Sequence, residues 1–405
     1  MQCLVGIDDT DSSSGSCTTY LAFRVARDLN PTLKVVAYPR LVRLNPNIPF
    51  KTRGNAAVCL PIETDDPDEA FRQIKRLLAK LAEVSNGANS GLVFLEDLSV
   101  LPHLRALYQQ ALSGLVNRHR VERLLRELRV RTFTLGNGMG LVGAASSLSF
   151  AEDSDHTFEL IAYRLKDSWG TPRLVDASSV RAMDRSTFPH TFNNYDYQKR
   201  KVLITPHGPD PVFVGIRGDS PAAVATAFNQ VRYDESLEGY MVYLSNQHTD
   251  AHLANPLNWK VFSSGWADGV VDSTSTGPGG HLYVTIRGGN ETHPCAIYEP
   301  TGDLRRAMKL LRPGDSIRVF GGVRRGTPIH PKVLNVEKVE VIASVSRGPK
   351  RHLRPGIYVS SPRANRHLTK PLIRYGRETA RQASPRFKDW FWAEPISRPT
   401  PARSR

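Results

Sequence analysis

The opening of the chain constrains its fold more than any other segment. Apolar residues at Leu4, Val5 and Ile7 predict a buried strand, and an amphipathic helical pattern begins near Cys17. The intervening sequence, DDTDSSSGS, is a polar loop that carries three carboxylates within its first four positions. The segment is therefore predicted to be a strand, a loop and a helix that are built around oxygen ligands.

The three carboxylates, Asp8, Asp9 and Asp11, are hard oxygen ligands of the kind that magnesium prefers, and magnesium usually brings substrate phosphates with it. The flexible loop and the helix N-terminus favour a bound anion. We therefore interpret the segment as a nucleotide-phosphate site. Its spacing is neither that of a Walker loop nor that of the dinucleotide fingerprint. An alternative is that the aspartates only cap turns, because Asp, Ser and Gly are ordinary loop residues.

A glycine-rich turn, TLGNGMG, precedes a helix of small residues further along the chain. Its glycines Gly136, Gly138 and Gly140 allow the backbone to approach a ligand closely, and the following helix adds a favourable dipole end. We predict that these glycines bind the nucleotide cofactor beside the carboxylate segment. The alternative is a turn that serves packing alone.

The remaining patterns indicate an α+β multidomain protein. Residues 1–150 hold the predicted nucleotide site, and strands mixed with helices favour a ferredoxin-like domain over 151–255, with a polar loop over 181–200. Over 256–345, three strands, one helix and two more strands match a five-stranded oligonucleotide-binding (OB) barrel. A small β-barrel without a nucleic-acid partner is the alternative.

Positive charge is concentrated at the end of the chain. The sequence has a net charge of +15, and residues 346–405 contain 15 Lys and Arg against 3 Asp and Glu, a net of +12. Aromatic residues between Phe387 and Trp392 lie within this basic tail. Basic residues interleaved with aromatic ones suit phosphate neutralisation and base stacking, so we predict that the tail binds RNA. A basic, proline-rich extension that binds nothing specific is the alternative.

The cysteines indicate neither a disulfide framework nor a cysteine-rich zinc site. Cys3, Cys17, Cys59 and Cys295 lie far apart and form no CxxC pair. Metal chemistry is therefore expected on carboxylates, with magnesium and without zinc. No stretch approaches the roughly 18 uninterrupted apolar residues of a membrane span, and the opening lacks the pattern of a signal peptide, so we expect a cytoplasmic protein.

Several long segments resemble the archaeal agmatidine synthetase family, the isoleucine-tRNA 2-agmatinylcytidine synthetases. The likeness spans residues 1 to about 345 and continues over 366–374. The segments that carry it are GIDDTDSSSGSCTTY, YPRLVRLNPNIPFKTRGNAAV, HTFELIAYR, FNNYD, VGIRGDSP, SNQHTDAHL, GGHLYVTIR, CAIYEPTGDLRRAMKLLRPGD and RHLTKPLIR. Motifs of this length in the same order are highly specific.

The resemblance implies an ATP-dependent ligase that couples agmatine to the C2 carbon of the wobble cytidine in a CAU-anticodon isoleucine tRNA, so that the tRNA reads AUA. It implies a kinase-like domain over 1–150, which can interleave with the ferredoxin-like domain, and then the OB barrel. In this family the C2 oxygen is phosphorylated before the amine displaces it, and a threonine that corresponds to Thr18 can become phosphorylated. The expected partners are this tRNA and agmatine, and the expected cofactors are ATP and magnesium.

The chemistry of these residues agrees with that reaction. A cytosine C2 carbonyl is a poor electrophile, so its oxygen must become a leaving group, and phosphoryl transfer depends mainly on positioning and charge neutralisation. We expect the three aspartates to hold magnesium and Thr18 to contact the phosphoryl group. Lys51 and Arg53, in the loop NPNIPFKTRGN, are expected to neutralise the transferring group.

Agmatine is a dication whose guanidinium pairs well with a carboxylate. The carboxylates in matching motifs are Asp196 in FNNYD and Asp250 in SNQHTD, with Asn193 and Asn194 as polar neighbours. We predict these four residues as agmatine contacts, although Asn and Asp in such loops also shape turns.

The chain departs from the family pattern at three places. The resemblance implies a zinc ribbon between the barrel and RHLTKPLIR, yet residues 346–365 contain no cysteine. Met139 and His248 stand where the family usually has a basic residue and a glycine. A ribbonless enzyme must bind tRNA through the barrel and the basic tail alone, bind it more weakly, or serve another substrate. The alternative is a paralogue that keeps ATP and RNA binding and acts as an RNA-binding or regulatory module, or on another RNA.

Overall fold

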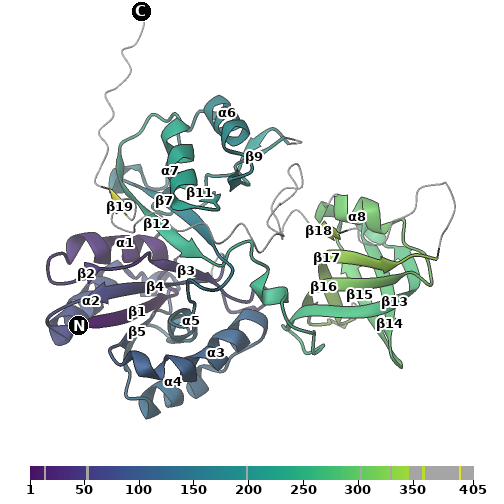
Figure 1. Cartoon of the computed structure of the whole chain (residues 1–405), viewed down its shortest axis with the longest axis horizontal. Helices are drawn as coiled ribbons and strands as arrows, with labels where there is room; N and C mark the ends of the chain where they lie inside the picture. Colours follow the sequence, from purple (N-terminus) through teal and green to yellow (C-terminus); the bar gives the residue numbers. More distant parts are fainter. Residues whose placement is uncertain are drawn as a thin grey trace, which may run out of the picture.

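The computed structural model describes residues 1–12, 15–51, 54–197, 199–301, 303–328, 331–345, 358–360 and 392–393. These residues form an α+β protein in two parts: a body with one long mixed sheet and, on the right of Figure 1, a barrel. Arg53 and almost all of the basic tail, including the aromatic cluster up to residue 391, lie outside the described residues. No helix among the described residues is both long and apolar enough to cross a membrane.

The first half of the body is built around β1 (Gln2–Asp8), the strand that the opening apolar run predicts. β1 pairs antiparallel with both β4 and β5, so it lies inside the sheet. Val5 and Ile7 pack into one apolar core and Leu4 into another, because successive side chains of a strand point to opposite faces. The other strands of this half are β2 (Lys34–Val35), β3 (Arg40–Arg43), β4 (Ala56–Glu63), β5 (Gly91–Leu95) and β6 (Arg131–Thr134).

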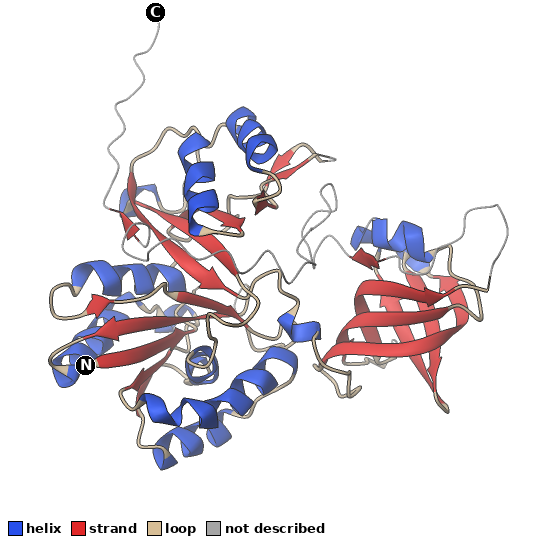
Figure 2. Ribbon diagram, viewed as in Figure 1, coloured by secondary structure: helices blue, strands red, loops and turns tan. Residues whose placement is uncertain are grey.

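Helices cover both faces of this part of the sheet (Figure 2). One core includes α1 (Thr18–Asp28) and α2 (Pro67–Leu81), and the other includes α3 (Leu101–Ser113), α4 (Arg118–Glu127) and α5 (Gly140–Ser147). The start of α2 follows from local sequence. The Asp66 side chain accepts a hydrogen bond of 2.9 Å from the Glu69 amide, and Pro67 occupies the first helical position.

Helix α5 packs directly on the sheet because glycines lie at the contact. A Cβ on Gly6 of β1 would lie 2.1 Å from the Ala144 carbonyl oxygen, and one on Gly91 of β5 would lie 2.2 Å from the Leu141 nitrogen. Only residues without a side chain allow two backbones to approach so closely. The small-residue helix therefore packs on β1, the strand that ends at Asp8 and leads into the loop with Asp9 and Asp11, called here the aspartate loop.

The second half of the body alternates strand, helix, strand, helix and strand. These elements are β7 (Thr157–Arg164), α6 (Ala177–Thr187), β11 (Val212–Gly218), α7 (Pro221–Gln230) and β12 (Leu237–Ser245). Short strands between α6 and β11 are β8 (Thr191–Phe192), β9 (Tyr195–Asp196) and β10 (Lys201–Val202).

The predicted polar loop over 181–200 is wrong for its first part, because α6 extends to Thr187. Val180 and Met183 are buried on one side of this helix, and the Asp176 side chain accepts a hydrogen bond from the Ser178 amide at its start. Two apolar residues among many polar ones give only a weak helical pattern, so the sequence does not reveal this helix.

The two halves of the body share one sheet, because β3 pairs parallel with β12. Among the described residues the strand order of this eleven-stranded sheet is β6-β5-β1-β4-β3-β12-β7-β11-β8. In addition, β2 pairs with β4, and β19 (Trp392–Ala393) pairs antiparallel with β12. The segments 1–150 and 151–255 are therefore joined both by the sheet and by the apolar core that packs against it.

The barrel contains β13 (Ser264–Thr276), β14 (Leu282–Gly288), β15 (Glu291–Ile297), α8 (Asp303–Met308), β16 (Ser316–Arg324) and β17 (Val333–Ala343). Pairing of β15 with β17 closes the sheet around its own apolar core. β18 (Tyr358–Ser360) adds a further strand beside β17. Three strands, one helix and two strands follow one another in the order that the sequence predicts.

The loop that follows β3 joins the body to the barrel. Asn45 donates a hydrogen bond of 2.7 Å to the Phe262 carbonyl oxygen, and Asn47 donates one of 2.8 Å to Oγ of Ser264. A second contact pairs Nε2 of His252 with Glu337 at 3.2 Å. The barrel is thus held beside the segment that carries Lys51.

Candidate functional site

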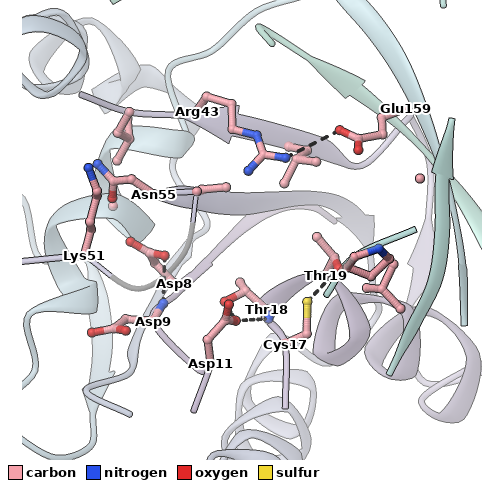
Figure 3. A pocket seen from close by; sticks show the side chains of 18 of the residues that line it. Asp8, Asp9, Asp11, Cys17, Thr18, Thr19, Arg43, Lys51, Asn55 and Glu159 are labelled. Atoms are coloured by element: carbon pink, nitrogen blue, oxygen red, sulfur yellow. Dashed lines mark hydrogen bonds and ion pairs between the residues drawn. The ribbon is translucent and has the colours of Figure 1, made fainter. Parts of the chain in front are cut away.

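A cavity of about 460 Å³ opens in the body at the end of β1. The loop after β1, the start of α1, helix α5, the loop between β3 and β4, and strands β7 and β11 bound it. Figure 3 shows polar side chains from these elements pointing into one space. The lining residues that bear on its chemistry are Asp8, Asp9, Asp11, Cys17, Thr18, Arg43, Lys51, Gly140, Gly143, Glu159, Asn193, Lys201, His207, Asp210 and Arg217.

Asp8 is the last residue of β1, and its carboxylate lies against helix α5. A Cβ on Gly143 would come within 1.8 Å of Asp8 Oδ2, so a glycine at this position makes room for the carboxylate. The other oxygen, Oδ1, accepts a hydrogen bond of 2.7 Å from the Asp9 amide. Burial, followed by the negative charge of Asp9, raises the pKa of Asp8 well above its usual range. A cation in the cavity would favour the ionised form again.

Asp11 holds the start of α1. Its Oδ1 accepts hydrogen bonds from the Thr18 amide at 2.8 Å and from the Thr18 hydroxyl at 3.3 Å. The Thr18 hydroxyl in turn accepts a hydrogen bond of 3.1 Å from the Thr10 hydroxyl. Cys17, the residue before the helix, makes no capping bond with its side chain. Asp11 therefore satisfies one of the amides that a helix start leaves open, and it orients Thr18 at the cavity wall.

An ion-pair cluster with a buried carboxylate and two partly buried guanidinium groups forms the opposite wall. Glu159 of β7 pairs with Nη2 of Arg217 at 2.9 Å and with Nη2 of Arg43 at 3.6 Å. The Arg43 Nε also donates a hydrogen bond of 2.8 Å to Gln247. Burial lowers the pKa of Arg43, and the charge of Glu159 opposes this effect. Two guanidinium groups and one carboxylate leave a net positive charge at this wall, which favours an anionic ligand.

Cys17, Asp210 and Lys51 complete the polar lining. Burial, followed by the charges of Asp11 and Asp210, raises the pKa of Cys17 to about 12, so its thiol stays protonated. Asp210 is buried and accepts a hydrogen bond of 3.0 Å from the Val212 amide. Lys51 donates a hydrogen bond to the Pro46 carbonyl oxygen, and burial followed by the charge of Arg324 lowers its pKa. Arg324 belongs to the barrel, so the barrel's charge reaches the edge of this cavity.

The structure brings together only part of the predicted site. Asp8, Asp9, Asp11, Thr18, Lys51, Gly140 and Asn193 all line the cavity. Gly136 and Gly138 do not line it: a Cβ on Gly136 would meet the Ala88 carbonyl oxygen at 2.7 Å, and Gly138 faces Arg118 and Thr134. These two glycines therefore pack against the chain itself. Arg53 lies outside the described residues.

Three of the predicted agmatine residues also lie elsewhere. Asn194 is fully buried and donates hydrogen bonds to Asp184 and Thr191, and Asp196 accepts one of 3.0 Å from the Lys199 amide. Asp250 pairs with Lys338 of the barrel and lines a different cavity of about 150 Å³. Hydrogen bonds and an ion pair within the chain thus already bind these three polar side chains.

Sequence reasoning missed five charged lining residues: Arg43, Glu159, Lys201, Asp210 and Arg217. Glu159 offers a signal, because it is a single charge within the otherwise apolar run of β7, and buried charges are rare unless they are paired. Asp210 lies in a turn-rich loop, HGPDPV, where aspartate is ordinary.

The donors in the cavity suit a magnesium ion whose shell is completed by phosphate oxygens. Among the described residues no group of three or more His, Cys, Asp or Glu side chains is arranged to hold a metal ion by itself. Magnesium, however, usually takes one or two carboxylates and completes its shell with waters and phosphate oxygens. Asp8, Asp9 and Asp11 offer hard oxygen atoms within one cavity, and the charges of Asp9 and Asp11 both raise the pKa of Asp8. The residues therefore fit such an ion.

Family models match the body of the chain in two consecutive parts. The model of the TiaS TCKD domain matches residues 4–137, and that of the TiaS FLD domain matches residues 138–252. The cavity takes residues from both matched parts, with Asp8 in the first and Glu159 in the second.

Individual relatives are similar over most of the chain. An isoleucine-tRNA 2-agmatinylcytidine synthetase, TiaS, from Cenarchaeum symbiosum is 42% identical over 356 residues, which is 85% of this chain and 78% of the relative. The crystal structure of a TiaS complex with its isoleucine tRNA and ATP matches with a TM-score of 0.84, 32% identity and coverage of 94% of this chain and 99% of that chain. A TiaS complex with tRNA, AMPCPP and agmatine matches with a TM-score of 0.81, 30% identity and coverage of 94% and 98%.

Proposed function

This chain belongs to the TiaS family of isoleucine-tRNA 2-agmatinylcytidine synthetases, and we propose that it conjugates agmatine to C2 of the wobble cytidine of a CAU-anticodon isoleucine tRNA at the expense of ATP. The product, agmatidine, lets the tRNA decode AUA. The observation that carries this proposal is the cavity at the end of β1, where carboxylates, a threonine hydroxyl and cationic side chains from both matched domains meet. The substrates are those with which related TiaS enzymes were crystallised.

The reaction needs a leaving group on C2, because the carbonyl of cytosine is a poor electrophile. In the first step the O2 atom attacks a phosphorus of ATP, so an O–P bond forms and the bond from phosphorus to the departing nucleotide breaks. In the second step the primary amine of agmatine attacks C2, and the C2–O bond breaks as phosphate departs with the O2 oxygen. The amine loses a proton, and a C–N bond remains, so the enzyme is a ligase.

The aspartate loop is the phosphate end of this cavity in our proposal. Asp8, Asp9 and Asp11 would hold magnesium, which when bound supplies charge neutralisation to the phosphates of ATP. Thr18, oriented by Asp11 at 2.8 Å, places its hydroxyl beside the transferring phosphoryl group. Gly140 lines the same cavity and would lie beside the phosphates, although its amide donates a hydrogen bond of 2.8 Å to the Asn89 carbonyl oxygen.

Cationic side chains would contact the phosphates from the side of the cavity away from the aspartate loop. Lys51 lines the cavity from the loop after β3, and Arg53 follows two positions later in the sequence. We propose that both neutralise the transferring group, with Arg43 and Arg217 adding fixed positive charge from the wall. Phosphoryl transfer depends chiefly on such preorganised charge.

Agmatine binding in the cavity requires a carboxylate that pairs with its guanidinium. Of the four predicted contacts, Asn193 lines the cavity, and we keep it as an agmatine contact. Two carboxylates outside the aspartate loop also line the cavity, Glu159 and Asp210. Glu159 is shared by two arginines, whereas Asp210 pairs with Arg173 alone at 3.5 Å, so we propose Asp210 as the carboxylate that also accepts the guanidinium.

We further propose that residues 1–150 act as a kinase-like domain, 151–255 as a ferredoxin-like domain and 256–345 as an OB domain. The strand, helix, strand, helix, strand order from β7 to β12 supports the second label, and closure of the barrel by β15 and β17 supports the third. The barrel and the basic tail would bind tRNA, since residues 346–365 carry no cysteine for a zinc ribbon.

The test is a reconstituted reaction. Purified protein is incubated with ATP, magnesium, agmatine and a CAU-anticodon isoleucine tRNA transcript, and the nucleosides are separated by mass spectrometry. We expect agmatidine at the wobble position, and none when ATP or agmatine is omitted. A transcript with the CAU anticodon of methionine tRNA is the control. Only unmodified cytidine at saturating ATP and agmatine would refute the proposal.

A further inference from the structure

The barrel carries a cavity of its own, of about 340 Å³. It lies where the start of β15, the end of β16 and the start of β17 meet the segment before β13. Its lining includes Trp259, His293, Pro294, Val323, Lys332 and Leu334. A volume of this size accommodates a single planar group such as a nucleobase.

An aromatic pair marks one side of this cavity. The rings of Trp259 and His293 are stacked, with 3.7 Å between their centroids and 9° between their planes. Burial lowers the pKa of His293, so its ring is neutral at neutral pH. Two flat neutral rings in parallel form a platform on which a third flat ring can stack.

The backbone holds the tryptophan in a strained position. Trp259 has a φ of +57°, a left-handed conformation that bulky residues rarely adopt. Lys332 supports it by donating a hydrogen bond of 3.3 Å from Nζ to the Trp259 carbonyl oxygen. Such strain persists only where the surrounding structure imposes it, and it is common at binding sites.

One cationic side chain lines the cavity, and others follow its lining residues in the sequence. Lys332 lines it and is exposed, and Lys260 follows Trp259 directly as another exposed cation. Arg324 and Arg325 are exposed and follow Val323, the β16 residue in the lining. Glu291 is the acidic residue of the lining, and its 80% exposed side chain lies 3.7 Å from Nε2 of His293. An anionic strand with flat bases fits this combination better than an apolar peptide does.

The barrel cavity also lies near the cavity at Asp8, the catalytic cavity, because residues next to the two linings contact one another. Asn47 packs against Gly322, where a Cβ would come within 1.7 Å of Asn47 Nδ2. Gly322 directly precedes Val323 of the barrel cavity, and Asn47 directly precedes Ile48, which lines the catalytic cavity. The charge of Arg324 lowers the pKa of Lys51, so these cations are close in space. One RNA segment can therefore touch both places.

We propose that the barrel cavity binds one unpaired nucleotide of the tRNA substrate, whose base stacks on the Trp259 and His293 pair while Lys332 contacts its phosphate. This proposal rests on the proposed function for the identity of the RNA. Binding there positions the tRNA while the wobble cytidine occupies the cavity at Asp8. It gives the enzyme an anchor that does not depend on a zinc ribbon.

The experiment measures tRNA affinity directly, without ATP or agmatine, in the full-length protein. His293→Ala removes one of the two rings of the platform, and His293→Phe restores a flat ring. Lys332→Ala removes an exposed cation together with its hydrogen bond to the Trp259 carbonyl oxygen. His281→Ala is the matched control, because His281 also contacts an aromatic ring of the barrel, Tyr298 at 5.2 Å, away from this cavity.

We expect His293→Ala to raise the dissociation constant for tRNA about 10-fold, as loss of one stacked base does, and His293→Phe to stay within about twofold of the native protein. Lys332→Ala should lower the salt slope of binding by about one phosphate contact. In turnover assays the KM for tRNA should rise in His293→Ala while kcat and the KM for ATP stay unchanged. A photocrosslink from 4-thiouridine-substituted tRNA should map to the peptide with Trp259 or His293.

Equal affinities of His293→Ala and His281→Ala, or an unchanged salt slope in Lys332→Ala, would overturn the proposal. Failure of His293→Phe to recover binding would do the same. The binding measurement is separable from the proposed function, since it needs no agmatidine. A native protein that forms no agmatidine but shows this pattern of affinities would refute only the reaction.

Discussion

The backbone amide of Thr18 donates a hydrogen bond of 2.8 Å to Oδ1 of Asp11, and the Thr18 hydroxyl donates a second one of 3.3 Å to the same oxygen (Figure 3). One carboxylate therefore caps α1 and orients the hydroxyl that faces the cavity. This arrangement explains why the aspartate loop and the helix start occur together in the sequence: the loop supplies the cap that Cys17 does not.

Asp11→Ala should lower the rate of agmatidine formation about 100-fold, because it frees the Thr18 hydroxyl and removes a charge from the phosphate end. Loss of the cap should also cost about 1 kcal/mol of stability. Asp66→Ala is the control, since Asp66 caps α2 in the same way outside the cavity. It should lose similar stability in thermal unfolding and keep its activity. Full activity of Asp11→Ala would contradict the role of this cap.

Asp8→Asn should abolish the ATP-dependent reaction and leave the dissociation constant for tRNA unchanged, because Asp8 holds metal rather than RNA in our proposal. It should also stabilise the ligand-free protein at neutral pH. The pKa of Asp8 is raised in the folded state, so its ionisation costs stability as pH rises from the usual aspartate range through the raised pKa.

The stability difference between Asp8→Asn and the native protein should therefore shrink as the pH falls toward the ordinary aspartate pKa, which thermal unfolding at several pH values would measure. Asp65→Asn, at an exposed position outside the cavity, is the control. A variant that is less stable than the native protein at neutral pH would argue against the buried, repelled carboxylate.

Gly143→Ala should reduce turnover strongly, since the added Cβ would lie 1.8 Å from Asp8 Oδ2 and must displace that carboxylate. Ser146→Ala lies in the same helix, is buried and does not line the cavity, so it controls for packing. We expect kcat to fall in Gly143→Ala and to persist in Ser146→Ala, with steady-state kinetics as the measurement. Equal kcat values in the two variants would count against the placement of Asp8.

Glu159→Gln should destabilise the fold by about 3 kcal/mol, because it leaves two partly buried arginines, Arg43 and Arg217, near one another without their shared buried carboxylate. Glu122→Gln breaks a partly exposed pair with Arg118 and should cost about 0.5 kcal/mol or less. Denaturant unfolding compares the two. A Glu159→Gln protein as stable as Glu122→Gln would show that the cluster contributes no stability.

Deletion of residues 346–405 should weaken tRNA binding and flatten its dependence on salt, because this segment carries a net charge of +12. Titrations of tRNA at several salt concentrations measure both effects. If the truncated protein binds as tightly and with the same salt slope, the tail has no role in RNA binding.

Local patterns predict a good part of this structure. The apolar run before Asp8 specifies β1, Asp66 and Pro67 specify the start of α2, and the strand and helix order specifies the barrel. These signals depend on neighbours in sequence, so they are visible without a structure. Asp8, Asp9, Asp11 and Thr18 lie within eleven consecutive positions of the sequence, so their sharing of one cavity follows in the same way.

Long-range contacts are what the sequence does not reveal. Glu159 meets Arg43 only because β3 pairs with β12 and β12 with β7, a relationship across more than one strand that no local pattern contains. Asp196 and Asp250 lie in motifs that look chemical, yet contacts with the Lys199 amide and Lys338 engage them. Gly136 likewise packs against Ala88 rather than opening toward the cavity. The role of each of these residues depends on the residues that it contacts, and those contacts become visible only in the folded structure.

The central claim is that the cavity at Asp8 activates the C2 oxygen of the wobble cytidine by phosphorylation. The most direct measurement uses tRNA whose wobble cytidine carries ¹⁸O at O2, with ATP, magnesium and agmatine. We predict that one ¹⁸O atom appears in the released phosphate for each agmatidine formed, as mass spectrometry of the phosphate would detect. Recovery of the ¹⁸O in water or in the nucleotide product, with unlabelled phosphate, would contradict the account.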